Sequence, residues 1–232
     1  MKKILLAALL FPLAALAATT GYRLDSSPHD LRDLVSLQAG ARTYVNYCLG
    51  CHGIQFMRYK GLTELGISEA QIKEHLLFTA DKVGEPMKVA FDPKEGKAWF
   101  GVAPPDLSVV ARSRGADWLY TYLRTFYRDP KTLTGWNNAI YANVAMPHAL
   151  WTLQGEQGWD AKEHRLTEIS KGSMSPTQYD ATVRDLVNFL VYVGEPAASD
   201  RRSIGIVVLF VLLLVLFPFA YWLKKEFWKD VK

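Results

Sequence analysis

The chain of 232 residues has only two cysteines, and its formal net charge is only +4. Two cysteines exclude a small domain held together by several disulfides. Half of the residues are hydrophobic and 12% are aromatic, which excludes a largely disordered chain. At about 150 residues per domain, the length predicts one or two domains with a real core. The positive charge would indicate a nucleic-acid partner only if it were concentrated on the folded part.

Long apolar runs occur only at the two ends of the chain. Residues 1–17 begin with two lysines after Met, continue with a short apolar run and end in Ala-Leu-Ala, the pattern of a cleaved signal peptide. An uncleaved membrane anchor would need about 17 apolar residues or more. Residues 204–223 are 20 residues without a charge, enough to span a bilayer core of about 30 Å. We therefore predict an exported body at 18–200 and one transmembrane helix within 201–232.

Basic residues beside the second run predict its orientation. Four lysines follow it: Lys224, Lys225, Lys229 and Lys232. Arg201 and Arg202 precede it and weaken the bias, but export of the N-terminal part also places the lysine-rich end in the cytoplasm. The body itself carries 19 basic and 21 acidic residues. Its formal charge is therefore −2, and no nucleic-acid partner is expected.

Helical spacing is the main secondary-structure signal of the body. Apolar residues recur at spacings of three and four over residues 34–48, although Gly40 interrupts the pattern. A second helix is expected over 117–127, ended by the following Asp-Pro pair. A third, over 176–194, is preceded by the N-cap Ser175 and has a proline at its first position and a capping-box glutamine.

Two long segments, 79–101 and 147–172, are rich in glycine, proline and charge. The body shows no alternating strand pattern of useful length. We therefore predict a mainly α fold in which two long excursions interrupt the helices, followed by the C-terminal membrane helix.

The pentapeptide Cys48-Leu49-Gly50-Cys51-His52 is the most informative motif. Two thiols three positions apart can each bond to one vinyl group of a haem, and the next imidazole can ligate the iron. A redox-active dithiol needs no such histidine. A zinc site needs two more ligands at short spacing, and no other cysteine exists. A plain disulfide remains open, but covalent haem is the favoured interpretation in an exported body.

The second axial ligand would decide what such a haem does. The candidates in the body are Met57, Met87, Met146, Met174, His29, His75, His148 and His164. Met57 is too close in sequence to reach the opposite face of the haem, and Met174 directly precedes a helix cap. Met146 is followed by a proline, which favours an extended backbone that can direct the thioether at iron. The residues alone favour Met146 without settling the choice.

Further segments accompany the haem motif. They are Phe56-Met57-Arg58-Tyr59, Ala103-Pro104-Pro105-Asp106-Leu107-Ser108, Ala145-Met146-Pro147 and residues 185–196 (DLVNFLVYVGEP). With the single C-terminal membrane helix, they make the whole chain resemble the cytochrome c1 family, the haem subunits of bacterial and other cytochrome bc1 complexes. The resemblance implies a class I cytochrome c-like haem domain with long loop insertions.

The resemblance also implies the site residues. Cys48 and Cys51 would attach one haem c through two thioethers, His52 and Met146 would be the axial ligands of its iron, Pro105 would pack near the haem edge, and Arg112 would pair with a haem propionate. Arg114 stands beside Arg112, so a solvated surface arginine is the alternative. Many members have further prolines after the Met-Pro pair, where this chain has His148. His148 is thus a competing ligand that would give a lower potential.

Partners and reaction follow from the same resemblance. A member of this family accepts one electron from the Rieske iron–sulfur subunit and passes it to a soluble cytochrome c or equivalent carrier. A cytochrome b subunit carries out the quinol chemistry. We expect an electron-transfer subunit of a dimeric ubiquinol–cytochrome c reductase, anchored in the bacterial inner membrane with its haem domain in the periplasm. A haem peroxidase with an open axial position and a stand-alone anchored cytochrome are the competing interpretations.

Overall fold

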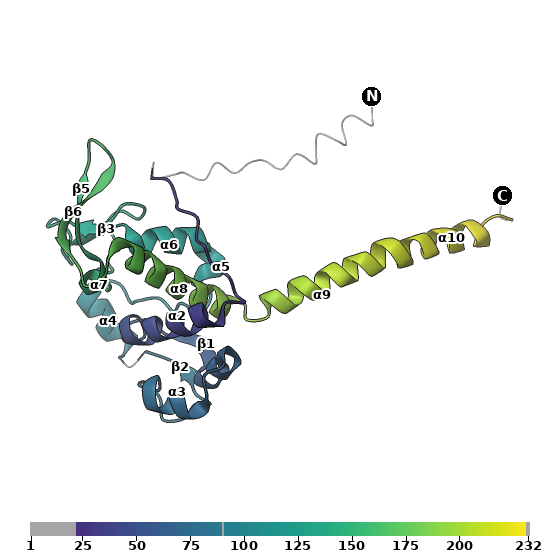
Figure 1. Ribbon diagram of the computed structural model, residues 1–232, viewed down its shortest axis with the longest axis horizontal. Helices are drawn as coiled ribbons and strands as arrows, with labels where there is room; N and C mark the ends of the chain where they lie inside the picture. The colour runs from purple at the N-terminus through teal and green to yellow at the C-terminus, as the bar shows by residue number, and fades with distance from the viewer. Residues whose placement is uncertain (1–21, 90, 231–232) are drawn as a thin grey trace.

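The computed structural model describes residues 22–89 and 91–230. The predicted signal peptide, residues 1–17, lies outside the described residues. A mainly helical body leads into one long helical rod that extends away from it (Figure 1). The predicted mainly α fold with one C-terminal apolar helix is confirmed.

Helices supply most of the regular structure of the body. They are α2 (Leu34–Tyr47), the 3-10 helix η1 (Tyr59–Leu65), α3 (Glu69–His75), α4 (Pro93–Phe100), α5 (Val110–Arg114), α6 (Ala116–Arg124), α7 (Trp151–Gln154) and α8 (Pro176–Gly194). The strands form three antiparallel pairs: β1 (Ile54–Arg58) with β2 (Pro86–Met87), β3 (Phe126–Arg128) with β4 (Trp136–Asn138), and β5 (Gly155–Asp160) with β6 (Arg165–Lys171). The β3–β4 and β5–β6 pairs are local, whereas η1 and α3 lie between β1 and β2 in sequence.

Helices α2 and α8 pack against each other at the centre of the body. Their contact faces include the fully buried side chains of Leu37, Tyr44 and Phe189. Gly40 lies at the crossing, because a Cβ atom built there would be 2.0 Å from the backbone oxygen of Asp185. The glycine that interrupts the apolar pattern is therefore the residue that lets the two helices approach closely.

Replacing Gly40 by alanine should destabilise the body. The added Cβ overlaps the backbone of α8, and overpacking of this kind costs about 1–3 kcal/mol, which outweighs the gain in helix propensity of about 1 kcal/mol. Urea unfolding of the detergent-solubilised full-length protein, followed by circular dichroism, measures the change. Gly84→Ala is the control, because a Cβ there meets no atom within 4 Å. Equal stability of the two variants would contradict the role given to the crossing.

The predicted boundaries hold for α2 and α8. They do not hold for the other predicted helix, 117–127. Helix α8 begins at a capping box formed by Ser175 and Gln178 and ends at Gly194. The helix predicted for 117–127 ends at Arg124, as α6, and β3 follows it.

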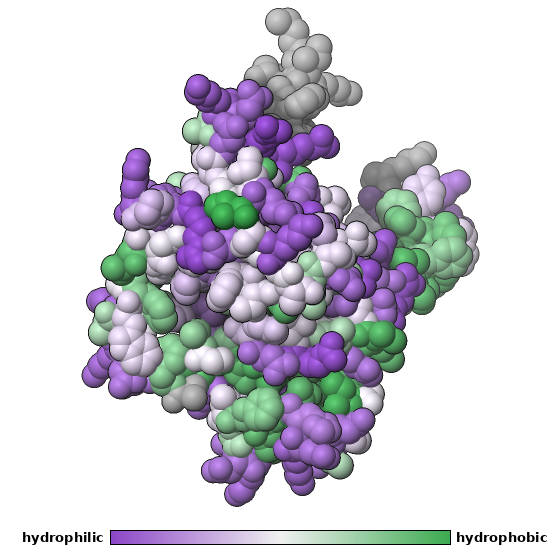
Figure 2. Space-filling model, turned by 60° about the vertical axis from the view of Figure 1, so that its left-hand side comes forward, coloured by the Kyte–Doolittle hydropathy of each residue, from purple (hydrophilic) through white to green (hydrophobic). Residues whose placement is uncertain are grey.

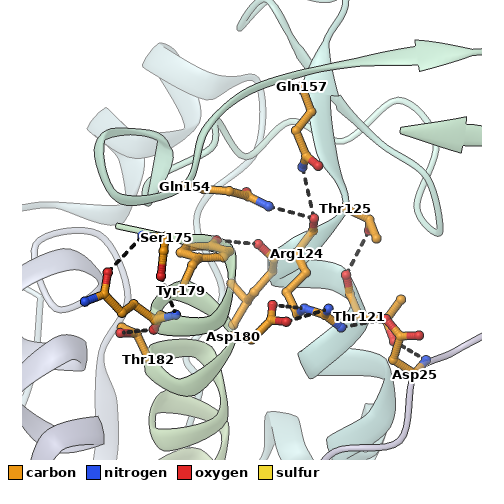
Figure 3. A network of polar contacts seen from close by, with 12 residues as sticks. Asp25, Thr121, Arg124, Thr125, Gln154, Gln157, Ser175, Tyr179, Asp180 and Thr182 are labelled. Carbon is orange, nitrogen blue, oxygen red and sulfur yellow. Dashed lines mark hydrogen bonds and ion pairs between the residues drawn. The ribbon is translucent and has the colours of Figure 1, made fainter. Parts of the chain in front are cut away.

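Side chains from three other elements hold the C-terminal end of α6 (Figure 3). The Tyr179 hydroxyl of α8 donates a hydrogen bond of 2.8 Å to the Leu123 oxygen. The amide groups of Gln154 and Gln157 donate to the Arg124 oxygen at 2.9 and 3.1 Å. These donors satisfy carbonyl groups that a longer helix would bond within itself. Because the donors are distant in sequence, no local pattern marks this helix end.

The two segments predicted as long excursions contain some regular structure. Residues 147–172 include α7 and the β5–β6 hairpin, which projects from the body (Figure 1). The hairpin strands are mostly half-buried or exposed, and their register shifts between Glu156 and Gln157. They therefore lack the alternation of a strand with one buried face. Residues 79–101 include β2 and α4, so both long excursions carry short regular elements that the sequence did not predict.

The predicted span, 204–223, lies within one rod of 30 residues, Ala198–Phe227. The rod consists of α9 (Ala198–Val211), the π-helical segment η2 (Leu212–Leu216) and α10 (Phe217–Phe227). It is not buried against the body, and Figure 2 shows the apolar surface of the part in view, at the right. Pro218 lacks an N–H and crowds the preceding turn, which accounts for the wider winding before it. The rod fits a single-pass membrane anchor.

Candidate functional site

Helix α2 ends where the cysteine motif begins. Cys48 caps the helix, and the backbone N–H groups of Cys51 and His52 both donate to the Cys48 oxygen, at 3.0 and 2.8 Å. This tight turn gathers two thiols and an imidazole directly after the helix. Both cysteines are free thiols, so the structure gives no support to a plain disulfide.

The two thiols have the properties of neither a redox dithiol nor a zinc site. Burial raises the pKa of the Cys48 thiol to about 12 and also raises the pKa of Cys51. Redox-active cysteines need a lowered pKa, and zinc binds thiolates. Among residues 22–89 and 91–230, no three His, Cys, Asp or Glu side chains are grouped so that they could hold a metal ion. These properties disfavour both a redox dithiol and a zinc site.

His52 is held by the loop that carries Pro105. Its Nδ1 atom donates a hydrogen bond of 2.7 Å to the Pro105 backbone oxygen. Burial lowers the pKa of His52, which favours the neutral ring, and the carbonyl acceptor places the ring proton on Nδ1. The Nε2 atom then carries the lone pair that a metal ligand needs. The structure thus brings two predicted site residues together, through the backbone of the proline.

Asp106 and Ser108 fasten this loop to β1. Asp106 accepts hydrogen bonds of 2.9 Å from the backbone N–H groups of Gln55 and Ser108. The Ser108 hydroxyl accepts one of 3.2 Å from the Phe56 N–H. The Pro105 oxygen is therefore directed at the imidazole by a loop bonded to the strand that follows the haem motif. Our sequence reasoning missed this positioning role, although an aspartate two residues before a serine is a known turn signal.

Met146 lies in a loop that is fixed on both sides. Before it, Asn143 has a left-handed backbone with φ of 59°, and its N–H donates to the Asn137 side-chain oxygen at 2.9 Å. After it, His148 is buried in the core. The Tyr122 hydroxyl donates a hydrogen bond of 3.5 Å to the Met146 sulfur. The half-buried thioether is therefore held in a defined position.

His148, the competing ligand, is engaged in the core. Its ring stacks on Phe126 with the centroids 4.9 Å apart and meets Trp136 edge-on at 5.1 Å. Its Nε2 atom donates to the Gln154 side-chain oxygen at 2.7 Å. Burial lowers the pKa of His148 to about 4, and the residue is only 2% exposed. These contacts give His148 a packing role and leave Met146 as the better candidate.

The remaining candidate ligands lie in the core or at the surface. Met57 and Met87 are buried in the hydrophobic core. The Met174 sulfur accepts a hydrogen bond of 3.4 Å from the Thr182 hydroxyl. The other three histidines of the body are exposed: His29, His75 and His164. None of these positions is favoured over Met146.

Arg124 ties α6, which carries Tyr122, to two other segments (Figure 3). Its guanidinium group lies 2.6 Å from the Asp25 carboxylate of the N-terminal segment and 2.6 Å from the Asp180 carboxylate of α8. It also lies over the Tyr120 ring, 4.6 Å from the centroid. Helix α6 is thereby fixed against α8, which in turn packs on the helix that leads into the cysteine motif.

Two neighbouring arginines of α5 have different surroundings. The Arg112 side chain is 59% exposed, and its Nη1 atom lies 3.3 Å from the Glu195 carboxylate. Glu195 also pairs with Arg201 at the start of the rod. The Arg114 guanidinium carbon lies 5.2 Å from the centroid of the Trp118 ring. Arg112 therefore faces the base of the anchor, whereas Arg114 faces the aromatic side chains of α6.

Comparison with known proteins decides the family, because residues 26–231 match the model of the cytochrome C1 family. The chain belongs to the cytochrome c1 family. Cytochrome c1 of Allochromatium vinosum is 45% identical over the full length of both chains. A protein of Nitrosomonas europaea named ammonia monooxygenase gamma subunit is 50% identical over 99% of this chain and 98% of its own. A chain from a hyperthermophilic respiratory Complex III covers 100% of this chain and 98% of its own, with a TM-score of 0.48 and 17% identity, too distant a likeness to support an argument.

Membership of the cytochrome c1 family implies a haem c, and the described residues fit it. Two free thiols provide two attachment points. His52 offers a neutral imidazole with Nε2 available, and Met146 offers a thioether held by a neighbouring hydroxyl. Imidazole and thioether are the ligand pair that haem iron has in cytochromes c.

Proposed function

We propose that this chain transfers single electrons from a Rieske iron–sulfur subunit to a soluble cytochrome c, or an equivalent carrier, within a ubiquinol–cytochrome c reductase. The complex would be dimeric, with the quinol chemistry in a cytochrome b subunit. The hydrogen bond from His52 Nδ1 to the Pro105 oxygen carries this proposal. It prepares one imidazole nitrogen for iron in a family whose cofactor is a haem.

The residues of the chain account for how the cofactor would be held. Cys48 and Cys51 would retain it covalently, while His52 and Met146 would ligate its iron. Bound haem c supplies reversible one-electron chemistry at a potential that a thioether ligand raises. With both side chains bound, the iron would offer no site for a substrate. This favours electron transfer over peroxidase chemistry.

We also propose that the body lies in the periplasm and the lysine-rich end of the rod in the cytoplasm. The anchor would keep the domain beside its membrane partners. The body has a formal charge of −2, and two haem propionates would make it more negative. This charge would attract a basic soluble carrier. Protease added to intact spheroplasts should digest the body and spare the C-terminal tail; protection of the body would contradict this orientation.

Purification of the tagged full-length chain from its native membrane in mild detergent tests the assembly. We expect cytochrome b and iron–sulfur subunits to co-purify and the preparation to reduce a soluble cytochrome c with quinol as donor. Co-purification with an ammonia monooxygenase, or migration of the chain alone, would contradict the proposed complex. Rapid stoichiometric binding of carbon monoxide to the reduced protein would contradict the two-ligand site and favour a catalytic haem.

The resemblance gives Arg112 a haem propionate as partner, whereas the structure pairs it with Glu195. Replacing Arg112 by glutamine separates the two roles, because a propionate partner predicts a lower reduction potential. Losing a positive charge beside the cofactor stabilises the oxidised, more positive iron. We expect a fall on the order of 50 mV in a redox titration, close to a tenfold change in the equilibrium. Arg114→Gln is the matched comparison, since both arginines lie in α5. A larger fall in that variant would move the propionate role to Arg114.

A further inference from the structure

Tyr122 contacts the sulfur atom of the proposed distal ligand. Its hydroxyl donates a hydrogen bond of 3.5 Å to Met146 Sδ across a separation of 24 residues in sequence. Tyr122 is only 9% exposed, and low local polarity strengthens such a bond. A thioether is a weak acceptor with two lone pairs. One lone pair can accept the hydrogen bond while the other binds a metal, so this contact is compatible with a ligand role.

Neighbouring rings fix the direction of the hydroxyl. Trp118, one turn earlier on α6, stacks on Tyr122 with the centroids 4.7 Å apart and 13° between the ring planes. Phe126 and Tyr141 meet the tyrosine ring edge-on, at 5.0 and 6.4 Å. Aromatic packing of this kind holds the ring in one orientation. The hydroxyl oxygen therefore stays beside the sulfur.

Gln154 also links the loop that carries Met146 to the end of α6. The side-chain oxygen of Gln154 accepts a hydrogen bond from His148, two residues after Met146. Its amide group donates to the backbone oxygen of Arg124, two residues after Tyr122. Donor and acceptor of the sulfur hydrogen bond are thus held relative to each other by a second, independent connection.

We infer that Tyr122 is a positioning residue for the Met146 ligand and that its hydrogen bond raises the reduction potential of the haem. The inference rests on the proposed function, in which Met146 is the distal ligand. A donated hydrogen bond draws electron density from the sulfur, which then donates less density to iron. Donation from a ligand stabilises oxidised iron more than reduced iron, and a thioether favours the reduced state because it is a weak donor. The hydrogen bond therefore favours the reduced state, in the way that groups behind a metal ligand tune a metal.

The variant Tyr122→Phe removes the hydroxyl and keeps the ring packing. A redox titration of the full-length holoprotein should show a change of at least threefold in the equilibrium toward the oxidised form, about 28 mV for one electron. The methionine–iron charge-transfer band of the oxidised protein should shift or weaken. Tyr141→Phe is the matched control, because it removes a hydroxyl from the same group of aromatic rings. Among the described residues, only the Tyr122 hydroxyl is bonded to Met146, so the control keeps that hydrogen bond.

The same substitution in a Met146→Leu background completes the test. Without the sulfur, removing the Tyr122 hydroxyl should change the potential no more than the control does. An effect equal to that of Tyr141→Phe in the native background would overturn the inference, and so would an effect that persists undiminished without the sulfur. A wrong assignment of Met146 as the ligand gives a different result, because Met146→Leu alone would then keep the charge-transfer band and the native potential.

Discussion

Replacing Met146 by leucine is expected to leave the haem covalently attached while lowering its reduction potential and stopping electron transfer. Leucine has a similar volume but no lone pair, so the iron loses the thioether that favours its reduced state. The fall should be a substantial part of the roughly 0.8 V range over which axial ligands set haem potentials. Redox titration and quinol-dependent cytochrome c reduction by the purified complex measure both effects.

Met174→Leu is the matched control for this variant. The Met174 sulfur also accepts a hydrogen bond, from the Thr182 hydroxyl, but it lies just before α8 and outside the proposed site. Its loss should leave the potential close to the native value. An unchanged potential and an intact charge-transfer band in the Met146 variant would show that another side chain is the ligand.

Replacing both Cys48 and Cys51 by alanine should abolish covalent haem. The two thiols are the only cysteines of the chain, so no other side chain can form the thioether bonds. Haem staining of a denaturing gel should show a strong band for the native chain and background for the double variant. The amount of chain is compared through an epitope tag, because a chain without its cofactor is more easily degraded.

Gly50→Ala is the control for the cysteine variant. It changes a residue between the two thiols but keeps both, and a Cβ there meets no atom within 4 Å. Its haem stain should match that of the native chain. Haem that stays with the double variant after denaturation would show that the attachment lies elsewhere.

The parts of the fold that the sequence predicted are those with a local signal. The capping box at Ser175 and Gln178 marks the start of α8, and the uncharged run at 204–223 marks the anchor. The end of α6 depends on Tyr179, Gln154 and Gln157, which are distant in sequence and carry no local mark. The β5–β6 hairpin lacks a buried face, so its residues show no alternation of polar and apolar side chains.

The candidate site divides in the same way. Cys48, Cys51 and His52 form a contiguous motif that predicts its own chemistry. The partner of His52 is a backbone oxygen, that of Pro105, and side-chain identity says nothing about such an acceptor. The core contacts of His148 were likewise not predictable, because the aromatic rings and the glutamine that engage it come from other elements.

Visible spectra of the purified full-length protein in both redox states test the central claim most directly. The account predicts the absorption of a c-type haem that stays with the polypeptide after denaturation, together with a methionine–iron charge-transfer band in the oxidised state. Haem that is extracted by acidified organic solvent would contradict covalent attachment at Cys48 and Cys51. A covalently bound haem without the charge-transfer band would contradict the assignment of Met146 as the distal ligand.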